Sequence, residues 1–275
     1  MNGPRPARRG PVRRPAVDNV RVPTYRDEAV VLRTHKLGEA DRIVTVLSRR
    51  HGKVRAVAKG VRKTSSKFGA RLEPFSQVDL QFATGRTLDV ITQAETIRAH
   101  SAPLSRDYPG YTAGQVMVEA ADRLVVEEHE PAPRQYLLLS GALAALTGGT
   151  TDGPRPPAML MDSYLLRAVA IAGYAPALNQ CARCGAPGPL EAFNVQAGGM
   201  VCAGCRPAGS TKVAAAQLGY LQALLAGDWV ATRDVADSVV TLSGGLVAAF
   251  VNWHLDRGIR SLGLVARGVR SDLRP

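Results

Sequence analysis

Four cysteines have the residue type and spacing best suited to chemistry in this chain of 275 residues. They form two CxxC pairs, Cys181 with Cys184 and Cys202 with Cys205, separated by seventeen residues. Two residues between thiolates allow a tight turn that directs both sulfurs at one ion, and two such turns complete a tetrahedron. The pattern therefore predicts a zinc site. A pair of disulfides is the alternative, which the lack of an apolar secretory segment near the amino terminus disfavours.

A site made of four cysteines has no open coordination position for water or substrate. We therefore expect Zn²⁺ to be structural. The five histidines lie far apart, at positions 35, 51, 100, 129 and 254, and the sequence contains no Walker loop, GxGxxG or GxSxG motif. No feature of the sequence supports an enzyme.

The formal net charge is +12, and the excess lies in the first hundred residues. Residues 1–100 contain 21 Lys and Arg against 9 Asp and Glu, whereas residues 101–275 contain 14 of each. This asymmetry predicts a polyanionic partner for the first third of the chain.

That prediction depends mainly on one basic run. Between positions 42 and 72 there are ten cations and no acid, and we predict that all ten bind DNA: Arg42, Arg49, Arg50, Lys53, Arg55, Lys59, Arg62, Lys63, Lys67 and Arg71. Glycines and hydroxyl residues interleave the part from 59 to 71, which is typical of a flexible loop that grips phosphates. A solvated charged face is the alternative.

Aromatic platforms for base stacking are scarce in the same region. The candidates are Tyr25, Phe68, Phe75 and Phe82, and the alternation of apolar residues assigns Phe82 to the core. We therefore expect DNA binding that is mostly electrostatic, weakly selective for sequence and steeply dependent on salt.

The elements that must position these residues change along the chain. Residues 1–23 are rich in Pro, Gly and Arg and predict a disordered basic arm or an inert extension. Residues 24–100 predict a domain of five strands, at 26–32, 42–47, 53–58, 77–82 and 88–97, with hairpin turns at 51–52 and 84–85. Five strands in under eighty residues favour an OB-fold barrel, with an SH3-like barrel as the alternative.

A helical domain is expected over residues 101–275. Apolar spacing predicts helices near 111–127, 134–146, 158–172, 213–226 and 233–257, and the cysteine module occupies 179–208. The fold class is therefore α+β multidomain. No apolar run approaches the length of a membrane span, so we expect a soluble protein. Because reduced cysteines fit the cytoplasm, we expect the protein there, associated with the nucleoid.

The order of these parts resembles the RecO family of bacterial recombination mediators. The run EAVVLRTHKLGEADRIVTVLSRRHGKVRAVAKGVRKTSSKFGARLEPF, from Glu28 to Phe75, is similar to the family's amino-terminal OB domain. The run LLRAVAIAGYAPALNQCARCG, from Leu165 to Gly185, is similar to the helix that leads into its zinc module, and RGIRSLGLV, from Arg257 to Val265, is a weaker match.

The resemblance implies a DNA repair factor that binds single- and double-stranded DNA, anneals complementary strands and, with RecR, helps to load RecA onto strands coated by single-strand-binding protein. RecF is a further candidate partner. Lys59, Arg62, Lys63 and Lys67 match the family's basic loop, and the four cysteines match its zinc ligands. A site for the acidic, apolar tail of single-strand-binding protein is implied on the helical domain, where Arg123, Arg134 and Arg167 are candidates by charge. An RNA-binding or RNA-modifying enzyme is the alternative.

Overall fold

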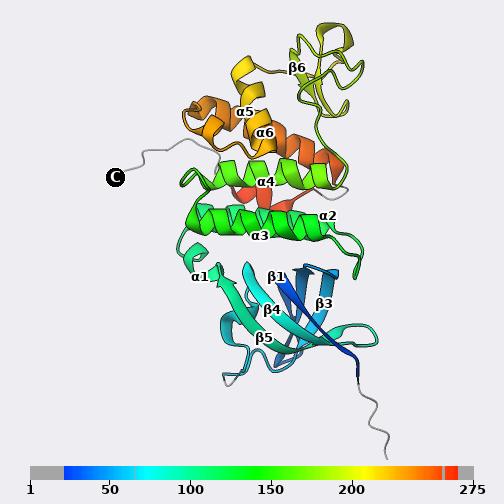
Figure 1. The fold of residues 1–275 in the computed structure, drawn as a ribbon, viewed down its shortest axis with the longest axis vertical. Helices are drawn as coiled ribbons and strands as arrows, with labels where there is room; N and C mark the ends of the chain where they lie inside the picture. The colour runs from blue at the N-terminus through cyan, green and yellow to red at the C-terminus, as the bar shows by residue number, and fades with distance from the viewer. Residues whose placement is uncertain (1–21, 65, 256–257, 266–275) are drawn as a thin grey trace, which may run out of the picture.

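The computed structural model describes residues 22–64, 66–255 and 258–265. The predicted basic arm lies outside them except for its last two residues. Figure 1 shows three parts: a barrel, a layer of stacked helices against it, and a small sheet-containing module at the far end of the helices.

The amino-terminal part is a closed five-stranded barrel of the OB type with strand order β1-β2-β3-β5-β4. All pairings are antiparallel except β3 with β5, which is parallel. The five predicted strands and both hairpins are confirmed, although β1 is much longer than its apolar run. The strands are β1 (Thr24–Leu37), β2 (Asp41–Ser48), β3 (Gly52–Ala58), β4 (Ser76–Ala83) and β5 (Asp89–Ala99).

Side chains of β1 belong to two hydrophobic clusters, because successive side chains of a strand point to opposite faces. Ala29 and Val31 belong to the cluster inside the barrel, whereas Val30 and Leu32 belong to the cluster of the helices. The continuous apolar run at 29–32 therefore reflects burial on both faces. Strand β1 thereby connects the hydrophobic cluster of the barrel with that of the helices.

The helical part is built around α4 (Pro157–Ile171), which is buried along most of its length and packs against α2, α3, α5 and α6. Gly173 follows it with φ +96°, a backbone conformation that glycine adopts without strain, and so ends the helix. The remaining helices are α1 (Ser101–Leu104), α2 (Tyr108–Leu124), α3 (Pro133–Gly148), α5 (Ala215–Ala226) and α6 (Asp237–His254). Short 3-10 turns are η1 (Gly69–Leu72), η2 (Ala203–Cys205), η3 (Val230–Thr232) and η4 (Arg260–Leu264).

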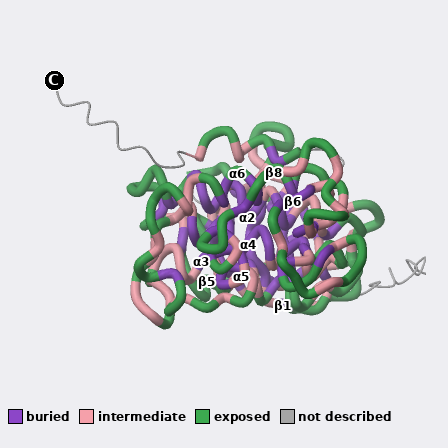
Figure 2. Tube along the Cα trace, turned by 90° about the horizontal axis from the view of Figure 1, so that it is seen from above, coloured by how far each residue is buried: buried purple, intermediate pink, exposed green. Residues whose placement is uncertain are grey.

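The five long helices were all predicted, and the four-residue α1 was not. Figure 2, seen from above the stack, shows the buried residues gathered along the middle of the helices and the exposed segments around the rim. Among the helices in the described part of the chain, none combines the length and apolar character needed to cross a bilayer.

The cysteine module contains a three-stranded sheet in the order β7-β6-β8. Its strands are only two or three residues long: β6 (Ala192–Asn194), β7 (Gly199–Val201) and β8 (Thr211–Lys212). The ring of Phe193 lies 5.7 Å from that of Phe250, which fixes the sheet to α6. The sequence did not reveal this sheet, because strands so short have no readable alternation.

Candidate nucleic-acid interface and cysteine cluster

The basic loop, residues 59–71, follows β3, includes most of η1 and is held on the barrel by hydrogen bonds. The backbone N–H of Gly60 donates to Asp41 Oδ1 at 2.7 Å, and that of Arg62 donates to the carbonyl of Ala40 at 3.0 Å. Further along, the Lys67 ammonium donates to the Thr92 carbonyl of β5 at 2.7 Å. The described part of the loop therefore has a defined position beside the β1–β2 turn and β5.

Two apolar side chains, near and just after the end of the loop, also anchor it to the barrel. Phe68 and Leu72 are each 1% exposed and belong to the cluster inside the barrel. All five cations of the loop are exposed: Lys59, Arg62, Lys63, Lys67 and Arg71. Because these apolar side chains are buried in the barrel, the backbone of the loop is held in place while its charged side chains face the solvent.

The five cations that precede the loop have a different environment. Each forms an ion pair with a carboxylate that is distant in sequence or lies beyond the run: Arg42 with Glu73 (2.8 Å), Arg49 with Glu28 (3.3 Å), Arg50 with Asp27 (3.3 Å), Lys53 with Asp122 (3.6 Å) and Arg55 with Glu128 (2.5 Å). The first half of the run contains no acid in its sequence, but in the folded chain carboxylates from outside the run neutralise its positive charge.

No carboxylate lies within ion-pair distance of the five loop cations among the residues that the structure describes. Arg62 donates to the Gly38 carbonyl at 3.1 Å, and Arg71 donates to the Lys67 carbonyl at 2.7 Å. A backbone carbonyl accepts a hydrogen bond without cancelling the charge. The uncompensated positive charge of the predicted DNA-binding set is thus concentrated in the basic loop, and DNA contact by any of the ten stays a prediction.

None of the four aromatic candidates offers an open stacking face. Phe68, Phe75 and Phe82 are at most 2% exposed, so the assignment of Phe82 to the core is confirmed. Tyr25 stacks on Phe82, and its hydroxyl donates to Asp89 Oδ2 at 2.5 Å. Burial, together with this carboxylate, raises the pKa of Tyr25 above its usual range. The barrel therefore has cations to offer a nucleic acid and few rings.

The four cysteines converge as predicted. Their sulfur atoms all lie within 4.8 Å of one another, and the Sγ atoms of Cys184 and Cys202 are 4.0 Å apart. A tetrahedral zinc site with bonds of about 2.3 Å requires sulfur separations near 3.8 Å, whereas a disulfide requires about 2.05 Å. All four thiols are free. The arrangement fits a metal ion bound by four thiolates.

Local backbone geometry prepares the first pair for this role. Gly185 takes φ +74°, and its N–H donates to the Cys181 carbonyl at 2.9 Å, closing the turn between the two sulfurs. The backbone N–H groups of Cys202, Cys184 and Arg183 lower the pKa of the Cys181 thiol to about 6. Neighbouring thiols raise the pKa of Cys205 instead. A cation at the centre would supply the charge that a set of four thiolates needs.

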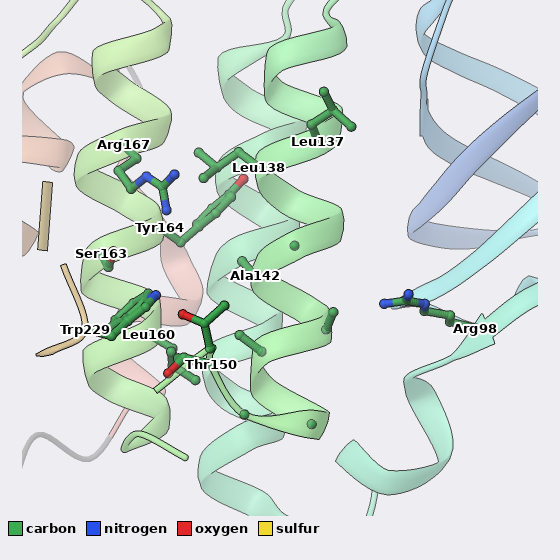
Figure 3. Close-up of a pocket in the computed structure, with 16 residues that line it drawn as sticks. Arg98, Leu137, Leu138, Ala142, Thr150, Leu160, Ser163, Tyr164, Arg167 and Trp229 are labelled. Atoms are coloured by element: carbon green, nitrogen blue, oxygen red, sulfur yellow. The ribbon is translucent and has the colours of Figure 1, made fainter. Parts of the chain in front are cut away.

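A cavity of about 460 Å³ lies between α3 and α4. Arg167 of α4 lies on one side of α3 and Arg98 of β5 on the other, with Leu137 and Leu138 between them (Figure 3). The Tyr164 hydroxyl is buried there and has no hydrogen-bond partner among the described residues. Of the three arginines proposed for a partner site, only Arg167 lines this cavity.

The other two candidates lie elsewhere. Arg123 pairs with Glu119 and donates to the Gly258 carbonyl, and Arg134 borders a separate groove beside α2. Sequence reasoning missed Arg98, because an isolated arginine at a strand end carries no local signal. It also missed Asp122 and Glu128 as partners of the barrel cations, since both lie far along the chain.

These observations define a class: an OB-barrel protein of mixed α and β structure, with a basic loop on the barrel and a metal-competent cluster of four cysteines on the helical part. Two family models match the chain, described as Recombination protein O N terminal over residues 22–100 and Recombination protein O C terminal over residues 105–263. The chain belongs to the RecO family, as the resemblance in its sequence implied.

Individual relatives agree. The chain is 62% identical over 246 residues to the DNA repair protein RecO of Cutibacterium acnes, covering 90% of this chain and 100% of the relative. It is 55% identical to the DNA repair protein RecO of Thermobifida fusca, covering 88% and 98% of the two chains. A third such relative, from a Nocardioides species, is also 55% identical.

Proposed function

We propose that this protein is a DNA repair and recombination mediator that binds single- and double-stranded DNA and anneals complementary strands. The observation that carries the proposal is the basic loop, five exposed cations without a carboxylate partner in the described structure, in a chain closely similar to DNA repair proteins. It acts in the cytoplasm, at the nucleoid, where cysteines remain reduced.

The mechanism needs no bond chemistry. Two complementary strands repel each other through their phosphates, and cations that neutralise phosphates on both strands lower that repulsion and release bound counterions. Phe68, Phe75 and Phe82 are buried and Tyr25 stacks on Phe82, so contact is made mainly to the backbone and leaves base edges available for pairing. A protein that works in this way is a binding factor and not an enzyme.

The test replaces three loop cations by glutamine, in the variant Lys59→Gln, Arg62→Gln, Lys63→Gln. Three lost phosphate contacts reduce the slope of log K against log salt by about 2 to 3, which at moderate salt corresponds to roughly a hundredfold weaker DNA binding. We expect strand annealing to fall at least tenfold and the melting temperature to stay nearly constant. Annealing is followed by fluorescence of labelled complementary oligonucleotides.

A matched control removes three exposed cations from the cysteine module, as Arg183→Gln, Arg206→Gln, Lys212→Gln. The change in net charge is the same, so a general effect of charge would weaken both variants equally. Equal annealing by the loop variant and the unmodified protein would refute the proposal.

We further propose that RecR and single-strand-binding protein are partners, that RecA is loaded with their help, and that RecF is a candidate. The cavity between α3 and α4 suits the acidic, apolar tail of single-strand-binding protein, because Arg98 and Arg167 flank apolar residues of α3 (Figure 3). An Arg167→Glu variant should lose at least tenfold in affinity for a peptide of that tail, measured by fluorescence anisotropy. An Arg134→Glu variant, altered outside the cavity, should bind as before.

Zn²⁺ is the ion we assign to Cys181, Cys184, Cys202 and Cys205. Four thiolates match its preference for sulfur and tetrahedral geometry, and when bound it cross-links the module without taking part in DNA contact. Metal analysis of the purified protein checks this, with one zinc per chain as the expected result.

A further inference from the structure

The connection between α2 and α3, residues 125–132, lies along the first half of β3. Glu128 forms a parallel bridge with Lys53, and the His129 N–H donates to the Lys53 carbonyl at 2.9 Å. Strand β3 pairs with β5 only at Ala56 and Val57. The connection therefore continues the pairing of β3 where β5 leaves it.

The approach of this connection to the barrel is close. A β-carbon built on Gly52 would lie 1.7 Å from the carbonyl oxygen of Glu130, so only glycine fits opposite it. His129 takes φ +61°, a left-handed conformation that a residue with a side chain adopts only when its surroundings require it. The position of the connection on β3 is thus fixed by the backbone on both sides.

The connection places the carboxylate of Glu128 against Arg55, one of the cations predicted to bind DNA. Glu128 Oε1 lies 2.5 Å from Arg55 Nε, and the two side chains are 32% and 43% exposed. Asp122 of α2 acts in the same way on its neighbours: its Oδ2 lies 2.7 Å from Arg33 Nε and its Oδ1 3.6 Å from Lys53 Nζ. Lys53, only 12% exposed in its side chain, is enclosed between the barrel and α2.

A carboxylate is chemically similar to a phosphate as a partner for guanidinium, since both are anions that accept charge-assisted hydrogen bonds from its planar N–H groups. We infer that Glu128 and Asp122 set the boundary of the DNA-binding surface: they occupy Arg55, Arg33 and Lys53, so that the phosphates of bound DNA follow the basic loop and stop short of the first half of β3. The inference rests on the proposed function and adds which cations DNA does not contact.

The experiment compares Glu128→Gln with Glu127→Gln. Glu127 is the neighbouring residue, is exposed and has no ion pair within the described residues, so both variants raise the net charge equally while only one frees Arg55. For a single-stranded oligonucleotide, one added phosphate contact steepens the slope of log K against log salt by about 0.7. We expect that change, and about fivefold tighter binding near 0.1 M salt, for Glu128→Gln relative to Glu127→Gln.

Arg55→Gln supplies the second measurement. In the unmodified protein it should leave DNA affinity within about twofold, because Arg55 is already paired, and in the Glu128→Gln background it should abolish the gain. Equal slopes for the two glutamate variants, or an Arg55→Gln defect as large as that of Lys63→Gln, would overturn the inference alone. Failure of the unmodified protein to bind DNA in a salt-dependent way would instead overturn the proposed function, and the inference with it.

Discussion

The barrel and the cysteine module are stabilised in different ways. The barrel encloses a cluster of fourteen buried apolar side chains, whereas the module's own cluster contains three, Cys181, Ala192 and Val201. Apolar burial can stabilise the first alone, while the second resembles the small folds that need a metal or disulfide. The basic loop therefore depends on a hydrophobic core, whereas the module depends on its four sulfur atoms.

The largest expected effect separates these two sources of stability directly. In Cys202→Ser one ligand of the predicted zinc site is lost, and structural zinc sites contribute on the order of 10 kcal/mol or more to the folding of small modules. We expect zinc content to fall well below one per chain and residues 179–208 to become sensitive to protease. Metal analysis and limited proteolysis measure the two outcomes.

The barrel should be unaffected by that change, and DNA binding at low salt provides the control. If Cys202→Ser kept a protected module without metal, the assignment of its stability to the sulfurs would be wrong. Loss of DNA binding with the module unfolded and the barrel intact would show that the two regions are not as independent as their cores indicate.

The complementary change is made in the barrel. Phe68 is 1% exposed inside the barrel cluster and supports the basic loop. Replacement of a buried Phe by Ala removes its transfer free energy and leaves a cavity, so Phe68→Ala should lower the free energy of unfolding by about 3–5 kcal/mol. Chemical denaturation measures the loss.

Two readouts make this prediction specific. Zinc content should stay at its original value, which is the reverse of the pattern expected for the cysteine variant. Leu37→Ala, in which the replaced side chain of β1 is 39% exposed, should cost less than 1 kcal/mol. A Phe68→Ala loss no larger than this control would mean that the loop is not anchored through the barrel core.

The sequence predicted the elements whose signals are local. The apolar run 29–32, the turn at 51–52 and the two CxxC pairs each occupy a few neighbouring residues, and the barrel, its hairpins and the cysteine cluster were all confirmed. The division of the chain at residues 23 and 100 and the DNA contacts stay predictions.

What the sequence did not reveal depends on distant partners. The run from 42 to 72 contains no acid, yet Asp122 and Glu128 neutralise part of it, because the fold brings α2 and the following connection onto β3. Charge along a chain and charge in space differ whenever such pairing occurs. The short strand β8, of two residues, was missed for a different reason: it is defined by its partner β6 and has no pattern of its own.

A smaller effect tests the seam between the barrel and the helical part. Gly52 and Gly38 both have left-handed backbone, with φ of +63° and +55°. Gly52 faces the Glu130 carbonyl, whereas no atom of the described residues lies within 4 Å of a β-carbon at Gly38. Gly38→Ala therefore measures the conformational strain alone, of order 1 kcal/mol. Gly52→Ala should lower the free energy of unfolding by about 1–3 kcal/mol more than this control, as measured by denaturation. Equal losses would mean that the connection can move off β3.

The smallest expected effect concerns a carboxylate outside both regions. Asp152 accepts hydrogen bonds from Arg233 and Arg155 and joins the α3–α4 connection to the segment around η3. The Arg233 guanidinium, opposed by desolvation and helped by Arg155, lowers the pKa of Asp152 to about 2. A carboxylate with a depressed pKa stabilises the fold fully at pH values above its pKa in the unfolded chain, near 3.9, and that contribution disappears as the pH falls through about 2.

Asp152→Asn should therefore be less stable than the unmodified protein at pH 7, and the difference should shrink between pH 4 and pH 2. Thermal melting across that range measures it, with Glu39→Gln, a change at an exposed residue that has no ion pair in the described part of the chain, as the charge control. A difference that stayed constant down to pH 2 would show that the two arginines do not act through the Asp152 charge.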